Sequence, residues 1–488
     1  MSASAQTQPT RPHAGFFGHP RALGNLFGLE MWERFSFYGM QGILTIYLYY
    51  SAAEGGLGLA EGTATSIVGA YGGLVYLSTI VGAWLADRVA GSERVLFASA
   101  IMIMFGHVSL ALLPGFLGIG AGLCLVALGS GGLKANATSL VGGLYSEGDD
   151  RRDAGFSIFY LGINVGAFAG PLLTGLARQQ LGFHYGFGLA ALGMAIGLVQ
   201  YSLGRKNLAA DANTVPNPLS TGNRVAAALI AGGVVVLVVV LVRAGAITAA
   251  NLAAVTVVVI VAAAIAYFAV LLSSRRVSRV ERRRVVSFIP MFLASFVFFA
   301  LFQQQFTVVV IYTDQRLDRN LFGWEMPVSW ANSINPIFII LLAGVFAALW
   351  TRLGPRQPST PAKFALGTVV MGVAFLLFLP WAGGGSNSTP LLGLVLILLL
   401  FTVAELLLSP VGLSLSTKLA PRAFRTQMVA LNFLSVALGT ATAGALAKYY
   451  NVDDEWPYFA MVGLAAVVFG LLLAVASPFI RRLMSGVR

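Results

Sequence analysis

Cysteine and histidine are nearly absent from this 488-residue sequence. The single cysteine, Cys124, excludes an internal disulfide. The four histidines are scattered, and no cluster of Cys and His residues offers a metal site. No catalytic triad or phosphate-binding loop is visible either. We therefore expect no metal, no bound cofactor and no enzymatic activity.

Charged residues are scarce as well. They make up 10% of the chain, whereas 57% of the residues are hydrophobic, and the mean hydropathy is +0.80. This composition lies far from that of soluble proteins and predicts a polytopic membrane protein in a lipid bilayer. The formal charge of +12 is compatible with nucleic-acid binding. However, the basic residues are spread over many short loops, so we expect no nucleic-acid partner.

Long apolar runs are what the sequence has in abundance. A helix needs about 20 apolar residues to cross the hydrocarbon, and fourteen stretches qualify. Their approximate spans are 24–50, 63–86, 94–113, 117–144, 155–176, 184–203, 224–243, 249–272, 287–312, 329–350, 362–381, 390–416, 426–447 and 457–481. The predicted fold class is therefore an all-α polytopic membrane protein.

The basic residues predict the orientation of these helices. If both termini are cytoplasmic, 24 of the 31 Lys and Arg residues lie inside, and Arg34 and Lys134 lie within the membrane. Only five lie outside, namely Arg178, Arg243, Arg316, Arg319 and Lys448. This asymmetry follows the positive-inside rule and predicts cytoplasmic termini.

Turn-rich and basic linkers divide the chain. We expect a disordered cytoplasmic arm over 1–21, a six-helix bundle over 22–204 and a second six-helix bundle over 287–482. Between them, residues 205–286 form a linker and two additional helices, made almost wholly of Val, Ala, Ile and Leu, which we interpret as facing lipid. Residues 483–488 are expected to form a cytoplasmic tail.

The stretch EMWERFSFYGMQ carries three charges inside the first apolar run. Glu30, Glu33 and Arg34 share one helix face, which Tyr38 and Gln41 extend by another turn. A charged residue at mid-bilayer costs roughly 3 kcal/mol on insertion scales, so such residues normally face a wet cavity and one another. The alternative is an interfacial helix whose charges reach the membrane surface. Two acids beside an arginine favour a proton relay.

Two further charges lie in apolar helices of opposite halves. Lys134 is in GSGGLKANATS, and Glu405 is the acid of AELLLSPVGLSLS. A lysine in the membrane needs a negative partner, so we expect an ion pair across the cavity. The alternative is that each side chain reaches the membrane surface independently.

The run FSIFYLGINVGAFAGPLL predicts a helix with two different faces. Phe156, Tyr160 and Asn164 recur every four residues and share one face. The opposite face carries a seam of small residues, Gly162, Gly166 and Gly170. We expect this seam to allow close helix packing.

Several of these motifs resemble those of one family. E-x-x-E-R-F followed by an aromatic pair and glycine is similar to the first-helix signature of the proton-dependent oligopeptide transporters, a branch of the major facilitator superfamily. The runs FSIFYLGINVG and ELLLSPVGLS resemble two further signatures of that family, and GAWLADRVAGSER resembles the major facilitator loop motif. The resemblance covers about residues 21–482.

The resemblance implies a major facilitator fold of two six-helix bundles with two inserted helices, as in bacterial fourteen-helix members. It also implies a monomeric symporter in the bacterial plasma membrane that imports di- and tripeptides together with protons, by alternating access. Protons are then the coupling ion. The alternatives are a transporter of the same family with a non-peptide anion or a drug as cargo, and a membrane sensor or scaffold without transport.

The residues and the resemblance together predict the functional positions. Proton coupling is expected of Glu30, Glu33, Arg34 and Glu405. Substrate binding is expected of Arg34, Phe37, Tyr38, Tyr76, Lys134, Phe156, Tyr160, Asn164, Asn335, Glu405 and Ser409. Gating is expected of Lys134, Glu405, Gln41, Gln303, Gln304, Asp87 and Arg88. For Asn335, which precedes a proline, a hinge is as compatible with the sequence as a substrate contact.

The chain also departs from the family pattern. Many relatives have an arginine at the position of Gln41 and an acid where FQQQFT supplies Gln303 and Gln304. Since both charges are lost together, we expect the glutamines to meet in a neutral outer gate. Many relatives also have tyrosine at the position of Phe37, so these departures leave the substrate preference open.

Overall fold

The computed structural model describes residues 15–146, 149, 151–208 and 210–486. Within these residues, thirteen helices are long and apolar enough to cross a membrane. Helix α1 (Arg21–Tyr49) is 29 residues long and contains Glu30, Glu33 and Arg34, and it makes a fourteenth. The predicted all-α membrane fold is thereby confirmed, and the one described sheet is the short hairpin of β1 (Asn320–Leu321) and β2 (Trp324–Glu325).

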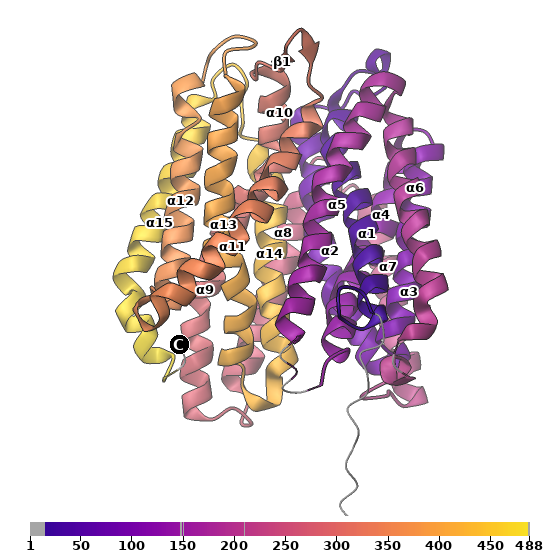
Figure 1. Cartoon of the computed structure of the whole chain (residues 1–488), viewed down its shortest axis with the longest axis vertical. Coiled ribbons are helices and arrows are strands. Elements are labelled where there is room, and N and C mark those ends of the chain that lie inside the picture. The colour runs from indigo at the N-terminus through magenta and orange to yellow at the C-terminus, as the bar shows by residue number, and fades with distance from the viewer. Residues whose placement is uncertain (1–14, 147–148, 150, 209, 487–488) are drawn as a thin grey trace, which may run out of the picture.

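Two helical halves lie side by side (Figure 1). The first half contains α1, α2 (Glu61–Leu85), α3 (Ser92–Leu112), α4 (Gly115–Gly143), α5 (Arg152–Leu181) and α6 (Phe183–Gly204). The second contains α9 (Arg279–Phe302), α10 (Val308–Gln315), α11 (Ile334–Leu353), α12 (Thr360–Leu376), α13 (Leu391–Leu419), α14 (Arg425–Ala447) and α15 (Trp456–Leu483). Short helical turns are η1 (Ala52–Glu54), η2 (Ala86–Ala90), η3 (Arg205–Asn207), η4 (Ala210–Asn213), η5 (Gln303–Phe306), η6 (Val328–Ser333), η7 (Gly354–Arg356), η8 (Leu379–Trp381) and η9 (Arg422–Phe424).

The helix predicted over 287–312 is broken in two. Helix α9 ends at Phe302, η5 follows, and Thr307, at φ −126° and ψ −95°, separates it from α10. Within a membrane the carbonyls freed by such a break need new donors. The Phe306 carbonyl accepts a hydrogen bond from the Thr45 hydroxyl at 2.5 Å, and the Gln305 carbonyl accepts one from the Asn332 amide at 3.0 Å.

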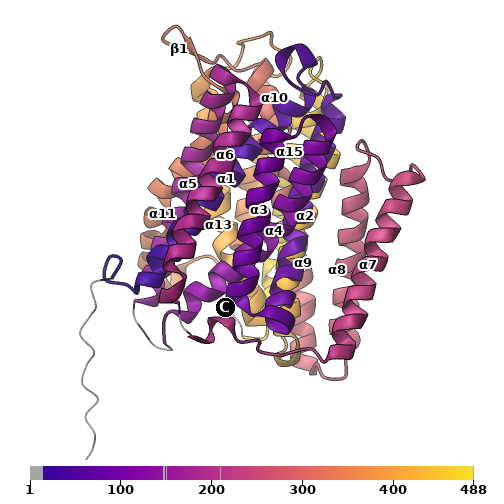
Figure 2. The same ribbon diagram turned by 90° about the vertical axis from the view of Figure 1, so that its right-hand side faces the viewer.

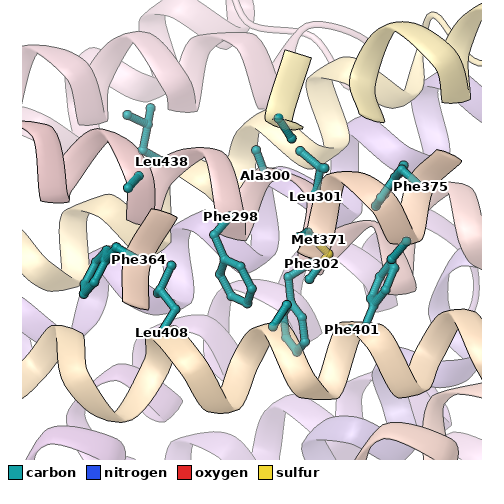
Figure 3. Close-up of a cluster of buried hydrophobic side chains, with 14 of the residues drawn as sticks. Phe298, Ala300, Leu301, Phe302, Phe364, Met371, Phe375, Phe401, Leu408 and Leu438 are labelled. Carbon is teal, nitrogen blue, oxygen red and sulfur yellow. The ribbon is translucent and has the colours of Figure 1, made fainter. Parts of the chain in front are cut away.

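Aromatic rings fill the core of the second half beside this break. Phe298 and Phe302 of α9 stack with their ring centres 5.5 Å apart, and Phe375 of α12 stacks on Phe401 of α13 at the same distance. Figure 3 shows these four rings converging from three helices. Their packing holds α9 against α12 and α13 just before the chain departs from the helical path.

Close packing in the first half depends on glycine. An added Cβ at Gly166 or Gly170 of α5 would lie 2.1 or 2.4 Å from the main-chain oxygens of Met31 and Phe35 in α1. The same addition at Gly162 would also collide with α1. The predicted role of this seam is confirmed, and it sets the close approach of the charged helix α1 to α5.

Helices α7 (Thr221–Arg243) and α8 (Leu252–Ser273) form the predicted inserted pair. No residue of α7 is buried, which agrees with a lipid-facing helix. Helix α8 packs against α2 of the first half and α14 of the second, and the Ser66 hydroxyl accepts a hydrogen bond from the Ala253 N–H at 3.1 Å. Figure 2 shows the pair standing at one side of the bundle.

The linker that leads to α7 lies against the turn after α2. Asn217 and Leu219 donate backbone hydrogen bonds to the carbonyls of Asp87 and Arg88 at 3.0 and 3.1 Å. The Asn217 amide also reaches the Asp87 carboxylate at 2.8 Å, and Arg88 pairs with Asp87 at 3.2 Å. The predicted gating residues Asp87 and Arg88 therefore contact the linker in this structure.

The two predicted tails contain structured residues. His19 is buried, with its Nδ1 atom 2.9 Å from the Tyr145 hydroxyl. Met484 is buried near the other end. The part of the expected disordered arm that covers 1–14 lies outside the described residues, whereas Phe16 and His19 form a β-bridge. We keep 22–204, 205–286 and 287–482 as proposed boundaries.

We expect Gly166→Ala to lower the thermal stability of the purified protein. Its new methyl group would meet the Met31 carbonyl at 2.1 Å, and overpacking of this kind costs about 1–3 kcal/mol. The matched control is Gly120→Ala in α4, where nothing lies within 4 Å of the added atom. Equal melting temperatures for the two variants in detergent would show that the seam is not tightly packed.

Candidate functional site

Arg34 is buried in α1 between two carboxylates. Its side chain is 2% exposed, and its Nε donates to Glu30 Oε1 at 2.8 Å and lies 3.0 Å from Glu33 Oε2. The i and i+4 spacing brings Glu30 to Arg34, as the sequence predicts. Neither Nη1 nor Nη2 makes a hydrogen bond within the part of the chain that the structure describes, although Nη2 lies 2.8 Å from Glu30.

Helix α4 contributes a hydroxyl and a cation to the same cluster. The Ser130 hydroxyl donates to Glu33 Oε1 at 3.1 Å, and Lys134, four residues later on the same face, interacts electrostatically with Glu33. The Lys134 Nζ lies 4.4 Å from the ring centre of Tyr76 in α2. Close packing of α2 on α4 requires Gly131, where a Cβ would lie 2.4 Å from Ser78.

Aromatic side chains enclose the charges. The Arg34 guanidinium carbon lies 5.7 Å from the Phe37 ring centre, and Phe37 stacks on Tyr71 at 6.0 Å. Tyr38 stacks on Phe306 of the opposite half, also at 6.0 Å. The Tyr71 hydroxyl is buried and makes no hydrogen bond within the described ranges.

Glu405 forms a second polar cluster, in α13. The Asn335 amide of α11 donates to Glu405 Oε2 at 3.1 Å and lies 3.0 Å from the Thr402 hydroxyl. Glu405 interacts electrostatically with Tyr160 of α5 and with Tyr38 of α1. Tyr38 also interacts with Arg34. It therefore interacts both with Glu405 of the second half and with the charged cluster of the first half.

The predicted ion pair across the cavity is not formed in this structure. Among the described residues, none of the ion pairs joins Lys134 to Glu405. Lys134 lies over Tyr76 and near Glu33, whereas the Glu405 carboxylate accepts from Asn335. Each charge thus has partners in its own half. The sequence could not show this, because a helix pattern does not reveal which neighbouring helix supplies a partner.

The predicted face of α5 points toward the second half. Tyr160, the ninth of the 30 residues of α5, is 42% exposed. Asn164 is buried, and its amide donates to the Tyr160 carbonyl at 2.9 Å. Since Tyr160 interacts with Glu405, its exposed surface faces the space between the halves. Phe156 and Ser409 are half-buried.

The predicted contact between Gln41 and the helix-break glutamines is wrong in this structure. Gln41 is buried, and its Oε1 has no hydrogen-bond partner among residues 15–146, 149, 151–208 and 210–486. Gln304 instead donates to the Ala300 carbonyl at 3.1 Å and accepts from the Tyr458 hydroxyl at 2.8 Å. Gln303 is buried nearby in η5. The prediction assumed a continuous helix, and the break at η5 changes the direction of these side chains.

Other hydrogen bonds join the two halves at the end of the molecule away from the C-terminus. The hydroxyls of Tyr49 and Tyr50 donate to the two oxygens of Asp314 at 2.5 and 2.8 Å. Gln315 donates to Glu61 at 2.8 Å. The η6 segment adds hydrogen bonds from Ser329 and Trp330 to carbonyls of α5. This end of the molecule is closed.

Sequence reasoning missed these closing residues and three others, Ser130, Thr402 and Tyr71. Ser130 and Thr402 have short hydroxyl side chains in apolar helices, and such side chains often bond to their own helix backbone. The positions of Ser130 and Thr402 in the sequence could have identified them. Ser130 and Thr402 lie one turn before Lys134 and three residues before Glu405, on or next to the faces that carry those charges.

Three comparisons with known proteins agree with this arrangement. A family model described as the POT family matches residues 93–461. A di-/tripeptide transporter of Lactococcus lactis subsp. cremoris is 40% identical, covering 97% of this chain and 98% of the relative. The crystal structure of a peptide transporter POT in complex with sulfate is 45% identical with a TM-score of 0.93, covering 97% of this chain and 98% of that one. A POT family transporter in complex with 5-aminolevulinic acid is 37% identical with a TM-score of 0.90, covering 96% and 98%.

We expect Asp314→Ala to open the closed end. The change removes the acceptor of both tyrosine hydroxyls, and a hydrogen bond to a charged group contributes about 1.5–3 kcal/mol. Spin labels on cysteines replacing the exposed Ala53 and Ser386, in a Cys124→Ser background, should report a longer and broader distance distribution.

The control for this experiment is Asp453→Ala, an exposed acid of a loop at the same end. It should leave the distance distribution unchanged. A distribution for Asp314→Ala that matches the unsubstituted protein would mean that the Asp314 contacts do not hold this end closed.

Proposed function

The chain belongs to the POT family, and from this premise we propose that it is a proton-coupled symporter that imports di- and tripeptides by alternating access. The POT family is a family of transporters, and the chain is a multi-pass membrane protein. We propose protons as the coupling ion, a monomer as the working unit and no bound cofactor. The basic loops support placing both termini in the cytoplasm of a bacterial cell.

The observation that carries the proposal is the lack of hydrogen-bond partners, within the described residues, for the terminal nitrogens of the buried Arg34. This guanidinium is buried between Glu30 and Glu33, yet its two terminal nitrogens make no hydrogen bond among the described residues. A planar guanidinium binds a carboxylate through two parallel hydrogen bonds. Arg34, supported by Lys134, is therefore suited to hold the carboxylate of a peptide.

The opposite half offers groups for the peptide amine. An ammonium group donates hydrogen bonds only, and Glu405 supplies a carboxylate in the second half. We propose that Glu405 binds the amine, that Asn335 positions Glu405, and that Asn164 contributes amide contacts. Tyr160, Tyr76 and Phe37 then provide apolar surface for side chains of different size.

Proton coupling follows from the charge balance around Arg34. Glu30 and Glu33 carry two negative charges, and Arg34 and Lys134 carry two positive ones, so one added proton leaves the group with a net charge of +1. We propose that protonation of Glu33 or Glu30 weakens its attraction for Arg34 and releases the guanidinium to a peptide carboxylate. The membrane potential adds about 2.3 kcal/mol per 100 mV for each charge that moves inward.

The closed end supports a cytoplasm-facing conformation. With the proposed orientation, the contacts of Tyr49 and Tyr50 with Asp314 seal the outer side. The exposed surface of Tyr160 then belongs to the space from which cargo leaves. The stacking of Tyr38 on Phe306 spans the halves next to Arg34, so substrate binding at Arg34 can affect the contact between the halves.

A second candidate cargo is a small amino acid with separated charges. It is favoured by one comparison, the POT family transporter in complex with 5-aminolevulinic acid. That molecule carries a carboxylate and an amine, so Arg34 and Glu405 suit it for the same reasons. A sensor or scaffold without transport is disfavoured, because it would not need five charged side chains between the halves.

Uptake into proteoliposomes tests the proposed function. We expect labelled dialanine to accumulate when the outside is acidic and to equilibrate only slowly without the gradient. Excess unlabelled trialanine should compete, and excess 5-aminolevulinic acid should compete less. Accumulation that does not depend on the proton gradient would contradict symport. Labelled 5-aminolevulinic acid taken up in place of dialanine would support the second cargo.

We expect Glu33→Gln to abolish gradient-driven accumulation while preserving exchange of dialanine across the membrane. The amide cannot bind the transported proton, but it keeps the shape of the side chain and a hydrogen-bond acceptor for Ser130. The control is Asp153→Asn, an exposed acid at the start of α5. Concentrative uptake by the Glu33 variant at the normal rate would exclude Glu33 as the coupling acid.

A further inference from the structure

A further pocket has a volume of about 630 Å³. The start of α9, which forms part of its wall, lies at the end of the molecule that carries the C-terminus (Figure 1). Its walls come from the start of α9, the end of α13, and the loop and first turns that lead into α14. None of its lining residues belongs to the candidate site described above. The pocket volume is in the range typical of small-molecule sites.

Basic side chains dominate the lining of this pocket. Arg284, Lys418 and Arg422 contribute three cations, and Glu281 contributes the one acid. Glu281 Oε1 accepts the backbone N–H of Arg422 at 3.0 Å, and Oε2 accepts that of Ser278 at 2.9 Å. Glu281 therefore ties the loop to the first turn of α9 through both of its oxygens, and the cations set the charge of the pocket.

Arg284 has more donors than acceptors around it. Its Nε is buried and makes no hydrogen bond within the described part of the chain. Its Nη2 makes one long contact of 3.3 Å with the Ser485 carbonyl. A buried guanidinium N–H needs an acceptor, and the planar group of arginine matches two oxygens of a phosphate.

We propose that this pocket binds a phosphate group, carried either by an anionic phospholipid of the adjacent leaflet or by a soluble phosphate compound. Basic pockets between helices at a membrane surface are suited to anionic headgroups. The exposed neighbours Arg282 and Arg283 on α9 add to the positive potential at its mouth. The inference depends on the position of this end at a membrane surface and is independent of the cargo.

The test compares phosphatidylglycerol with phosphatidylcholine and inorganic phosphate, each titrated into the purified full-length protein in neutral detergent. Binding to the folded state raises the melting temperature. We expect phosphatidylglycerol to raise it in a saturable manner, and phosphatidylcholine, with its neutral headgroup, to have a much smaller effect. Stabilisation by millimolar inorganic phosphate alone would identify the soluble form as the ligand.

The double variant Arg284→Gln/Arg422→Gln should weaken the apparent affinity at least tenfold, since it removes two charge-assisted contacts. The Arg422 change leaves the backbone bond to Glu281 in place. If the double variant unfolds, the single variant Arg422→Gln and the conservative Arg284→Lys provide the same comparison. The control is Lys206→Gln, an exposed cation of η3 at the start of the linker.

Two results would overturn the proposal. The first is equal stabilisation of the variants and the unsubstituted protein by phosphatidylglycerol or phosphate. The second is an effect of Lys206→Gln as large as that of the pocket variants, because this would show general attraction to the basic surface.

Discussion

The structure depends on the burial of one guanidinium between two carboxylates. An isolated charge in a membrane interior is strongly unfavourable, so Arg34 needs Glu30 and Glu33, and Glu33 in turn needs Ser130. The glycine faces of α5 and α4 bring helices close enough to enclose this group. In the same network Arg34 and Lys134 balance Glu30 and Glu33, so one added proton changes its net charge from zero to +1.

The helices and the positions of the charges could be predicted from the sequence because both depend on local patterns. The i, i+3 and i+4 spacing of Glu30, Glu33 and Arg34 fixes their common face, and the seam of Gly162, Gly166 and Gly170 needs only the helix period. The partners of Lys134 and Gln304 could not be predicted in the same way. These partners depend on which helix is adjacent and on the break in the helix after Phe302. The run FQQQFT contains no proline or glycine that would have predicted this break.

The break between α9 and α10 bears on the proposed movement of the two halves. In a continuous α9 the backbone carbonyls would accept hydrogen bonds within the helix. Because the helix is broken, the Phe306 carbonyl accepts a hydrogen bond from Thr45, and the Phe306 ring stacks on Tyr38. The first half therefore contacts the second at a segment where the helix is interrupted. Such a segment can change its dihedral angles without dismantling a full helix, which suits it to act as a hinge near the charged cluster.

The position of α8 across both halves has a kinetic consequence. The Ser66 hydrogen bond joins the N-terminal end of α8 to α2. The buried residues of α8 include Ala253, Thr256, Ile260 and Ala264, and the helix packs against both α2 and α14. If the halves rock as proposed, α8 cannot keep all its contacts with α2 and α14 unchanged, because these two helices belong to opposite halves. The inserted pair would then influence the rate of the cycle, whereas the affinity for cargo depends on the residues of the candidate site.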